Sequence, residues 1–192
     1  MLTFKNFNIA DWFSFYRIVA FPLLLLLLWL GNRDVFAIFL LISYLTDAVD
    51  GFLARKYKMT SARGSQLDSL GDQLTFIAGL LGLVYFEKDF IFENILLIIV
   101  VFSPYIIQMI IAYVKYKKTT AFHTYMAKIS AIMQSIFILH SLFYSPNHYL
   151  FYTMIAFGLL ETIEEIILIF MYDEWVSDVK SILWALKDKR RR

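Results

Sequence analysis

Apolar segments about as long as a membrane is thick recur along almost the whole chain. Hydrophobic residues make up 60% of its 192 residues and charged residues only 18%, whereas soluble domains average about 45–50% apolar and about 25% charged residues. Because a helix needs about 20 residues to cross a bilayer, the chain has room for about six or seven spans at most. The composition excludes a soluble globular domain and a disordered protein. It predicts an all-α integral membrane protein.

Polar breaks divide the chain into six predicted transmembrane helices. The break at residues 31–34 is only long enough for a turn between antiparallel helices. The residues around Trp29 make a poor signal-peptidase site, so we expect the first span to be retained. We expect a single transmembrane domain over residues 1–172. Its six spans cover residues 13–30, 35–56, 66–86, 90–113, 122–144 and 149–171.

Positive charges predict the orientation, because Lys and Arg in short loops stay on the cytoplasmic side. The loop after the second span, the loop after the fourth span and the carboxyl-terminal tail are all basic. The opposite loops hold only Arg33 and Lys88. Both termini are therefore predicted to face the cytoplasm, which requires an even number of spans.

Both ends of the chain are amphiphilic. Residues 1–12 mix apolar and polar side chains, and we expect an interfacial amphipathic helix there. Residues 173–192 are expected to form a basic amphipathic cytoplasmic tail that lies along anionic headgroups. The alternative for the tail is a topology signal with a solvated end. The apolar tail residues at helical spacing are Trp175, Val176, Val179, Ile182, Leu183 and Leu186.

Four aspartates lie inside predicted spans. Asp47 and Asp50 are three residues apart on the second span, and Asp68 and Asp72 are four apart on the third, so each pair shares one helix face. A carboxylate inside a span costs about 2.5–3.5 kcal/mol, which makes it a functional candidate. Because a short loop joins the two spans, all four side chains can meet in one layer near the cytoplasmic headgroups. The alternative is that Arg and Lys pair with them for folding alone.

These carboxylates predict a divalent metal site. The chain contains no cysteine, and oxygen ligands at this density suit hard cations such as Mg²⁺ or Mn²⁺. Two ions could be held, and two bridged metals serve displacement at phosphorus. Gly51, Ala54 and Gly64 remove side-chain bulk, so a phosphate-bearing group could approach the backbone. Small-residue helix packing is the alternative for these positions.

The second and third spans together carry a motif of fixed spacing. It reads Asp47-x2-Asp50-Gly51-x2-Ala54-Arg55-x8-Gly64-x3-Asp68-x3-Asp72. At every fixed position the motif resembles the signature of the CDP-alcohol phosphotransferases, also called CDP-alcohol phosphatidyltransferases, which are integral membrane enzymes of phospholipid synthesis. The series Asn8, Asp11, Ser14 and Arg17 is similar to the family's Asn, Thr, Thr, Arg pattern, with Asp11 and Ser14 in place of threonine.

The resemblance implies a reaction in which a CDP-linked lipid donates its phosphatidyl group to a small alcohol and releases CMP. It implies that Asp47, Asp50, Asp68 and Asp72 bind the metal ions, and that Asp72 is also the general base on the acceptor hydroxyl. It also implies a catalytic domain of six spans preceded by an interfacial helix. The cytidine diphosphate site would consist of Asp47, Gly51, Ala54, Arg55 and Gly64.

The motif does not determine which alcohol is the acceptor. Lys128 is a cation several residues inside the fifth span, and His123 lies near the start of that span. Both are candidates to bind a phosphorylated acceptor that enters from the cytosol, whereas the alternatives are a lysine that snorkels to the interface and an interfacial histidine. We expect glycerol-3-phosphate as the acceptor, then inositol phosphate, then inositol or serine.

Three acids of the sixth span, Glu161, Glu164 and Glu165, have no place in the motif. A structural network is the first expectation for them and recognition of the acceptor hydroxyl the second.

Two other classes of protein stay open. A divalent-cation transporter also places carboxylates in spans, but typically at the midplane between repeated halves, and a non-catalytic membrane scaffold needs no such cluster. We expect the inner (plasma) membrane of a bacterium with the active site on the cytoplasmic face. The expected partners are CDP-diacylglycerol, a small alcohol and membrane lipid, without nucleic acid, and the sequence leaves homodimer formation open.

Overall fold

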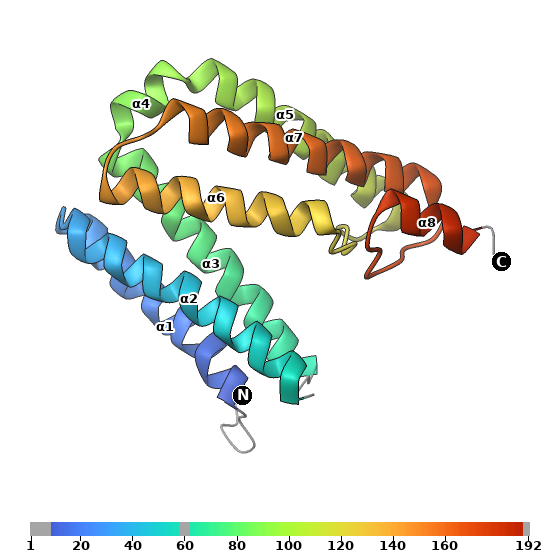
Figure 1. The fold of residues 1–192 in the computed structure, drawn as a ribbon, viewed down its shortest axis with the longest axis horizontal. Coiled ribbons are helices and arrows are strands. Elements are labelled where there is room, and N and C mark those ends of the chain that lie inside the picture. Colours follow the sequence, from blue (N-terminus) through green and yellow to red (C-terminus); the bar gives the residue numbers. More distant parts are fainter. Residues whose placement is uncertain (1–8, 58–61, 190–192) are drawn as a thin grey trace. The chain divides into compact units, whose positions relative to one another are not determined.

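The structure is a computed structural model that describes residues 9–57 and 62–189; for residues 9, 10, 50–57, 62, 63, 65 and 189 it describes only the backbone. Within these ranges the chain is helical, and its one extended pairing is an isolated bridge between Ala121 and Ser177. The helices are labelled in Figure 1. They are α1 (Ile9–Trp29), α2 (Arg33–Tyr57), α3 (Ala62–Phe86), α4 (Lys88–Glu93), α5 (Ile95–Tyr116), α6 (Tyr125–Phe143), α7 (His148–Met171) and α8 (Ile182–Lys189).

The long helices lie where the sequence predicts spans. Four of the described helices are long and apolar enough to cross a membrane, and the segments concerned lie in α1, α3, α5 and α6. The other two long helices, α2 and α7, each carry three acidic residues. The apolar segments are Asp11–Trp29, Gln66–Phe86, Ile95–Tyr116 and Tyr125–Phe143.

The predicted fourth span is not one continuous helix. It is broken at Asn94, which separates the short α4 from the long α5 and has φ −105° and ψ 10°. The Asn94 side chain donates a hydrogen bond from Nδ2 to the carbonyl oxygen of Phe90 at 2.9 Å. Side chains of this type compete with the backbone for its hydrogen-bonding groups and so interrupt helices. The apolar pattern continues on both sides of Asn94, so hydropathy alone does not reveal the break.

The amino end of the chain is described only in part, and the carboxyl end differs from the expected amphipathic helix. Residues 1–8 of the predicted interfacial helix lie outside the described residues, and residues 9–12 form the first turn of α1. Among the tail residues that the structure describes, only α8 is helical, whereas Trp175, Val176 and Val179 lie in an irregular stretch before it. The helical spacing of these three residues therefore does not correspond to a helix.

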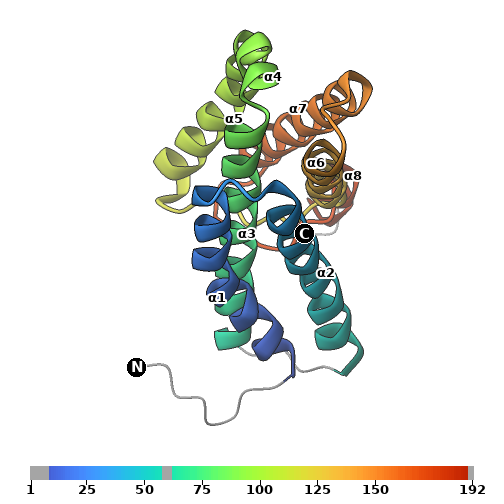
Figure 2. The same cartoon turned by 90° about the vertical axis from the view of Figure 1, so that its left-hand side faces the viewer.

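One compact unit consists of the described residues up to Lys88 together with Ile138–Ser145. Within it, α1 packs against both α2 and α3 (Figure 2). Phe36 of α2 has no exposed surface, and a Cβ atom placed on Gly82 of α3 would lie 2.5 Å from its Cε1 atom. Only glycine at position 82 therefore lets α3 pack this closely against α2.

The second unit consists of Asp89–Phe137 and Pro146–Arg192, and the described part of it includes α5, α7 and α8. Two residues of the tail, Val179 and Ala185, have no exposed surface and belong to its apolar core. Part of the tail is therefore packed into the second unit, while most of its described residues are exposed. The core comprises Ala112, Phe122, Leu168, Ile169, Tyr172, Val179 and Ala185.

Candidate active site

Three of the four predicted aspartates converge in the first unit. Asp47 comes from α2, and Asp68 and Asp72 come from successive turns of α3. One carboxylate oxygen of each lies within 4.8 Å of the other two. The three side chains are 44%, 45% and 49% exposed, in that order. The result is a cluster of partly exposed oxygen ligands that could hold a metal ion.

Arg17 of α1 contacts all three carboxylates. Its Nη1 atom donates to Oδ1 of Asp47 at 2.5 Å and to Oδ1 of Asp72. Its Nη2 atom donates to Oδ1 of Asp68 at 2.7 Å. The Arg17 side chain has no exposed surface, so α1 brings a positive charge to the cluster from the buried side. The sequence places Arg17 only in the amino-terminal pattern and indicates no role for it in the site.

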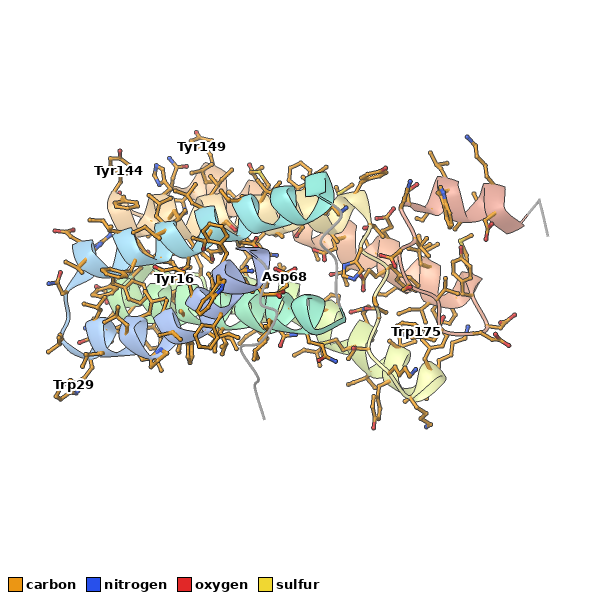
Figure 3. All side chains as sticks on the ribbon, turned by 90° about the horizontal axis from the view of Figure 1, so that it is seen from below. Tyr16, Trp29, Asp68, Tyr144, Tyr149 and Trp175 are labelled. Carbon is orange, nitrogen blue, oxygen red and sulfur yellow. The ribbon has the colours of Figure 1, made fainter. Side chains whose placement is uncertain are left out.

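Gly71 allows α1 to approach α3 at this level. It lies on α3 between Asp68 and Asp72, and a Cβ atom there would lie 3.3 Å from Cβ and Nε of Arg17 and from the carbonyl oxygen of Ser14. A larger residue would crowd the arginine. The small residue therefore helps to place the guanidinium beside Asp68, which lies next to α1 in Figure 3.

Other motif residues are only partly described. The backbone of α2 carries Asp50 one turn after Asp47, but the side chains of Asp50, Ala54 and Arg55, and the surroundings of Gly51, lie outside what the structure describes. Gly64 is partly buried in the first turn of α3, one turn before Asp68.

An open apolar surface cavity of about 400 Å³ lies between α1 and α2 in the same unit. Two of its lining residues, Tyr16 and Thr46, directly precede Arg17 and Asp47 in the chain. The apolar cavity therefore lies at the same height along the α1–α2 pair as the carboxylate cluster. The cavity is lined by Trp12, Phe13, Tyr16, Ile42 and Thr46.

The two predicted acceptor residues belong to the second unit. Lys128 is exposed in the first turn of α6, with Nζ 5.8 Å from the centre of the Tyr125 ring. His123 is exposed in the loop before α6 and has a φ of 54°. Their predicted role in acceptor binding remains a prediction.

The acids of α7 take part in a polar network of the second unit. Glu165 Oε2 accepts hydrogen bonds from Gln108 Nε2 at 2.6 Å and from Thr120 Oγ1 at 2.8 Å. Gln108 is only 1% exposed. Glu164 Oε1 accepts a hydrogen bond from the backbone N–H of Ile182 at 3.3 Å. These contacts favour a structural role for Glu164 and Glu165.

The fold and the site together define a class of protein. It is a helical protein that has apolar helices of membrane length and a carboxylate cluster between two of its helices. A family model described as CDP-alcohol phosphatidyltransferase matches residues 7–170 of the chain. The chain belongs to this family, which confirms the resemblance seen in the motif.

Several curated bacterial proteins are similar to part of the chain, and all carry the name CDP-diacylglycerol–glycerol-3-phosphate 3-phosphatidyltransferase. The Rickettsia typhi protein is 28% identical over 85 residues, 43% of this chain and 47% of its own length. The Haemophilus influenzae protein is 28% identical over 88 residues, 44% of this chain and 48% of its own length. The Yersinia enterocolitica protein is 36% identical over 70 residues, 35% of this chain and 38% of its own length.

The chain thus spans about half the length, or less, of the curated relatives it matches. No solved structure matches it.

Proposed function

We propose that the chain transfers the phosphatidyl group of CDP-diacylglycerol to glycerol-3-phosphate and releases CMP. The observation that carries this proposal is the convergence of Asp47, Asp68 and Asp72, whose oxygens lie within 4.8 Å of one another at positions of the family motif. In the reaction, the acceptor oxygen forms a bond to the phosphorus next to the diacylglycerol. The bond between that phosphorus and the CMP oxygen breaks, and CMP leaves with the electron pair.

The donor set of the site fits a divalent cation. All three described ligands are carboxylate oxygens, which hard cations prefer. Among the described contacts, the three negative charges are paired with one positive charge, the guanidinium of Arg17. We propose that Asp47, Asp50, Asp68 and Asp72 hold two Mg²⁺ or Mn²⁺ ions. Bound there, the ions would neutralise the diphosphate and stabilise the charge on departing CMP.

Each motif residue then has a proposed role. Asp72 is the general base that takes the proton of the acceptor hydroxyl as the oxygen attacks, since a carboxylate within hydrogen-bond reach can do this. Arg17 positions the carboxylates from the buried side. The apolar cavity between α1 and α2 suits an acyl chain of a lipid whose headgroup lies at the charged cluster. The cytidine diphosphate site is proposed to consist of Asp47, Gly51, Ala54, Arg55 and Gly64.

The proposed arrangement in the membrane has six spans, with α2 and α7 in addition to the four apolar helices. Residues 1–172 would form one catalytic domain, with an interfacial helix over residues 1–12 and the tail on the cytoplasmic side. A carboxylate that faces lipid is costly, so α2 and α3 must turn their aspartates toward the protein or its substrate. The location would be the bacterial inner membrane, with the active site open to the cytoplasm.

Glycerol-3-phosphate is supported as the acceptor by the names of the relatives. Lys128 and His123 are the proposed acceptor-binding residues, because a phosphorylated acceptor needs cations in addition to those of the motif. Inositol phosphate is the second candidate and would use the same cations.

A CMP-release assay tests the proposal. Purified protein with CDP-diacylglycerol and Mg²⁺ should release CMP with glycerol-3-phosphate and much less with inositol phosphate, inositol or serine. A transporter or a scaffold would release none with any acceptor, and this result would contradict the proposal.

A further inference from the structure

The tail of the second unit is bound to the loop that joins α5 to α6. We use "C-terminal segment" for residues 172–189 and "α5–α6 loop" for residues 117–124. The backbone N–H of Asp178 donates to the carbonyl oxygen of Ala121 at 3.0 Å, and Trp175 Nε1 donates to that of Thr119 at 3.0 Å. In the other direction, the N–H of Tyr125 donates to the carbonyl oxygen of Lys180 at 3.0 Å. Trp175 is labelled in Figure 3.

Apolar burial joins the same two segments. Phe122 from the loop is 1% exposed, and Val179 and Ala185 from the C-terminal segment have no exposed surface. All three belong to one core with Leu168 and Ile169 of α7. Removing these apolar side chains from water stabilises the contact, so it holds the segment more firmly than the hydrogen bonds alone.

Two acids of α7 connect to both segments. Glu165 accepts a hydrogen bond from Thr120 of the loop at 2.8 Å. Glu164 accepts one from the N–H of Ile182, the first residue of α8, at 3.3 Å. A carboxylate at a helix N-terminus is favourable because it satisfies a free N–H group and the helix dipole. Two of the three acids that the motif leaves unassigned therefore fix the loop and the C-terminal segment to α7.

The α5–α6 loop has a backbone that needs such support. His123, near its end, has a φ of 54°, whereas the φ of 56° at Lys117 belongs to the left-handed cap that ends α5. Residues other than glycine adopt this left-handed region uncommonly, and they keep it when the surrounding structure holds them there. The hydrogen bonds from Asp178 and Trp175 supply part of that surrounding structure.

We propose that the C-terminal segment is a positioning element for the proposed acceptor-binding residues. It holds the α5–α6 loop, and with it His123 and the first turn of α6, in the conformation that receives the acceptor. Lys128 lies in that turn, where its N–H donates to the carbonyl oxygen of Thr124 at 3.2 Å. The kinetic part of this inference rests on the proposed function, whereas the structural part does not.

The absence of cysteine in the natural chain gives a direct readout of the loop. Ala121→Cys introduces one thiol in the loop, and its rate of modification by a water-soluble maleimide measures how well the C-terminal segment covers it. Ser145→Cys places a thiol in the exposed loop before α7 and serves as the control reporter. Both reporters are measured in the full-length protein in detergent.

Val179→Asp is the test variant, because it puts a charge into the buried core. Leu183→Asp is the matched control, since it makes the same change in the same segment at a side chain that is 72% exposed. Local release should raise the labelling rate at position 121 at least about tenfold in Val179→Asp and leave it within about twofold in Leu183→Asp. The labelling rate at position 145 should not change in either variant.

Trp175→Phe is the milder variant if Val179→Asp does not fold. It removes the N–H donor to Thr119 and keeps an aromatic ring, so the labelling rate at position 121 should rise a few-fold. In both variants the KM for glycerol-3-phosphate should rise, while the KM for CDP-diacylglycerol should stay the same. Leu183→Asp should change neither constant.

The outcomes separate the two proposals. If the wild-type protein transfers no phosphatidyl group, the proposed function fails, and the labelling rates still test whether the segment holds the loop. Wild-type labelling rates in Val179→Asp and Trp175→Phe would overturn the positioning role. An equal rise of the labelling rate in Leu183→Asp would also overturn it, because it would indicate that the exposed face of the segment anchors it to the membrane. A released loop with an unchanged KM for the acceptor would overturn it as well.

Discussion

Arg17 and Asp68 form a hydrogen-bonded ion pair in which one partner is buried and the other is not. The Nη2 atom of Arg17 lies 2.7 Å from Oδ1 of Asp68, and the two side chains are 0% and 45% exposed. The arginine therefore holds the carboxylate from the interior of the first unit, while part of the carboxylate stays accessible to a cation or a substrate.

Removing Arg17 should destabilise the protein in a way that Mg²⁺ partly corrects. Arg17→Ala brings three carboxylates together without their shared partner, which should cost about 2 kcal/mol because hydrogen bonds between charged groups are lost. A divalent cation can replace the missing charge, so Mg²⁺ should raise the unfolding temperature more in Arg17→Ala than in the wild type. Thermal unfolding in detergent, with and without Mg²⁺, measures both effects.

Arg33→Ala is the matched control for that experiment. Arg33 is also an arginine of the first unit, and it donates to the carbonyl oxygens of Leu142 at 2.8 Å and Ser141 at 2.6 Å and pairs with Glu87. Its loss should lower the unfolding temperature without any special response to Mg²⁺. Equal rescue of both variants would show that the Mg²⁺ effect is not located at the aspartate cluster.

Asp72→Asn should separate catalysis from donor binding. The amide keeps the shape of the side chain and loses the ability to accept a proton, so the transfer rate should fall on the order of 10²-fold or more. Binding of CDP-diacylglycerol, measured by equilibrium titration, should remain close to that of the wild type. An equal loss of donor binding would reassign Asp72 to metal binding alone.

Lys128→Ala should mainly raise the KM for a phosphorylated acceptor. A point charge binds the phosphate equally in the ground and transition states, so kcat should change less. Lys128→Arg should restore part of the affinity, because the charge remains while the geometry differs. Lys88→Ala, at another exposed lysine, is the control. Unchanged acceptor kinetics in Lys128→Ala would mean that this lysine only extends its ammonium group to the membrane interface and does not bind the acceptor.

The proposed topology predicts which positions a membrane-impermeant reagent reaches in intact cells. Tags at both termini should be protected, whereas a thiol introduced by Ser145→Cys should be labelled from outside. This follows from the excess of Lys and Arg in the loops assigned to the cytoplasm. Access to a carboxyl-terminal tag from outside would contradict the even number of spans.

The sequence predicted the long helices well because apolar segments of membrane length between polar breaks favour helices. The end of α3 at Phe86 and the end of α7 at Met171 lie where the hydropathy pattern places them. The break at Asn94 and the buried tail residue Val179 were missed for a shared reason. Both depend on which groups a side chain meets in the folded protein, and an apolar pattern does not record that.

For the site, the motif predicted which residues meet but not what holds them together. Asp68 and Asp72 share a helix face by their spacing, so their convergence followed from local geometry. The role of Arg17 depends on the close approach of α1 and α3 at Gly71, between residues far apart in the chain. A charged residue inside an apolar segment was nevertheless a usable signal for Arg17, since such residues are expensive in a membrane.

The central claim is tested most directly by identifying the lipid that the purified protein makes. Protein given CDP-diacylglycerol, isotope-labelled glycerol-3-phosphate and Mg²⁺ should form labelled phosphatidylglycerol phosphate and an equal amount of CMP, both measured by mass spectrometry. EDTA should abolish the product, and added Mg²⁺ or Mn²⁺ should restore it. The Asp68→Ala variant should form no product. The Asp34→Ala variant, which changes an exposed acid outside the cluster, should behave as the wild type. Full turnover in chelator, or no labelled lipid from the wild-type protein, would contradict the account.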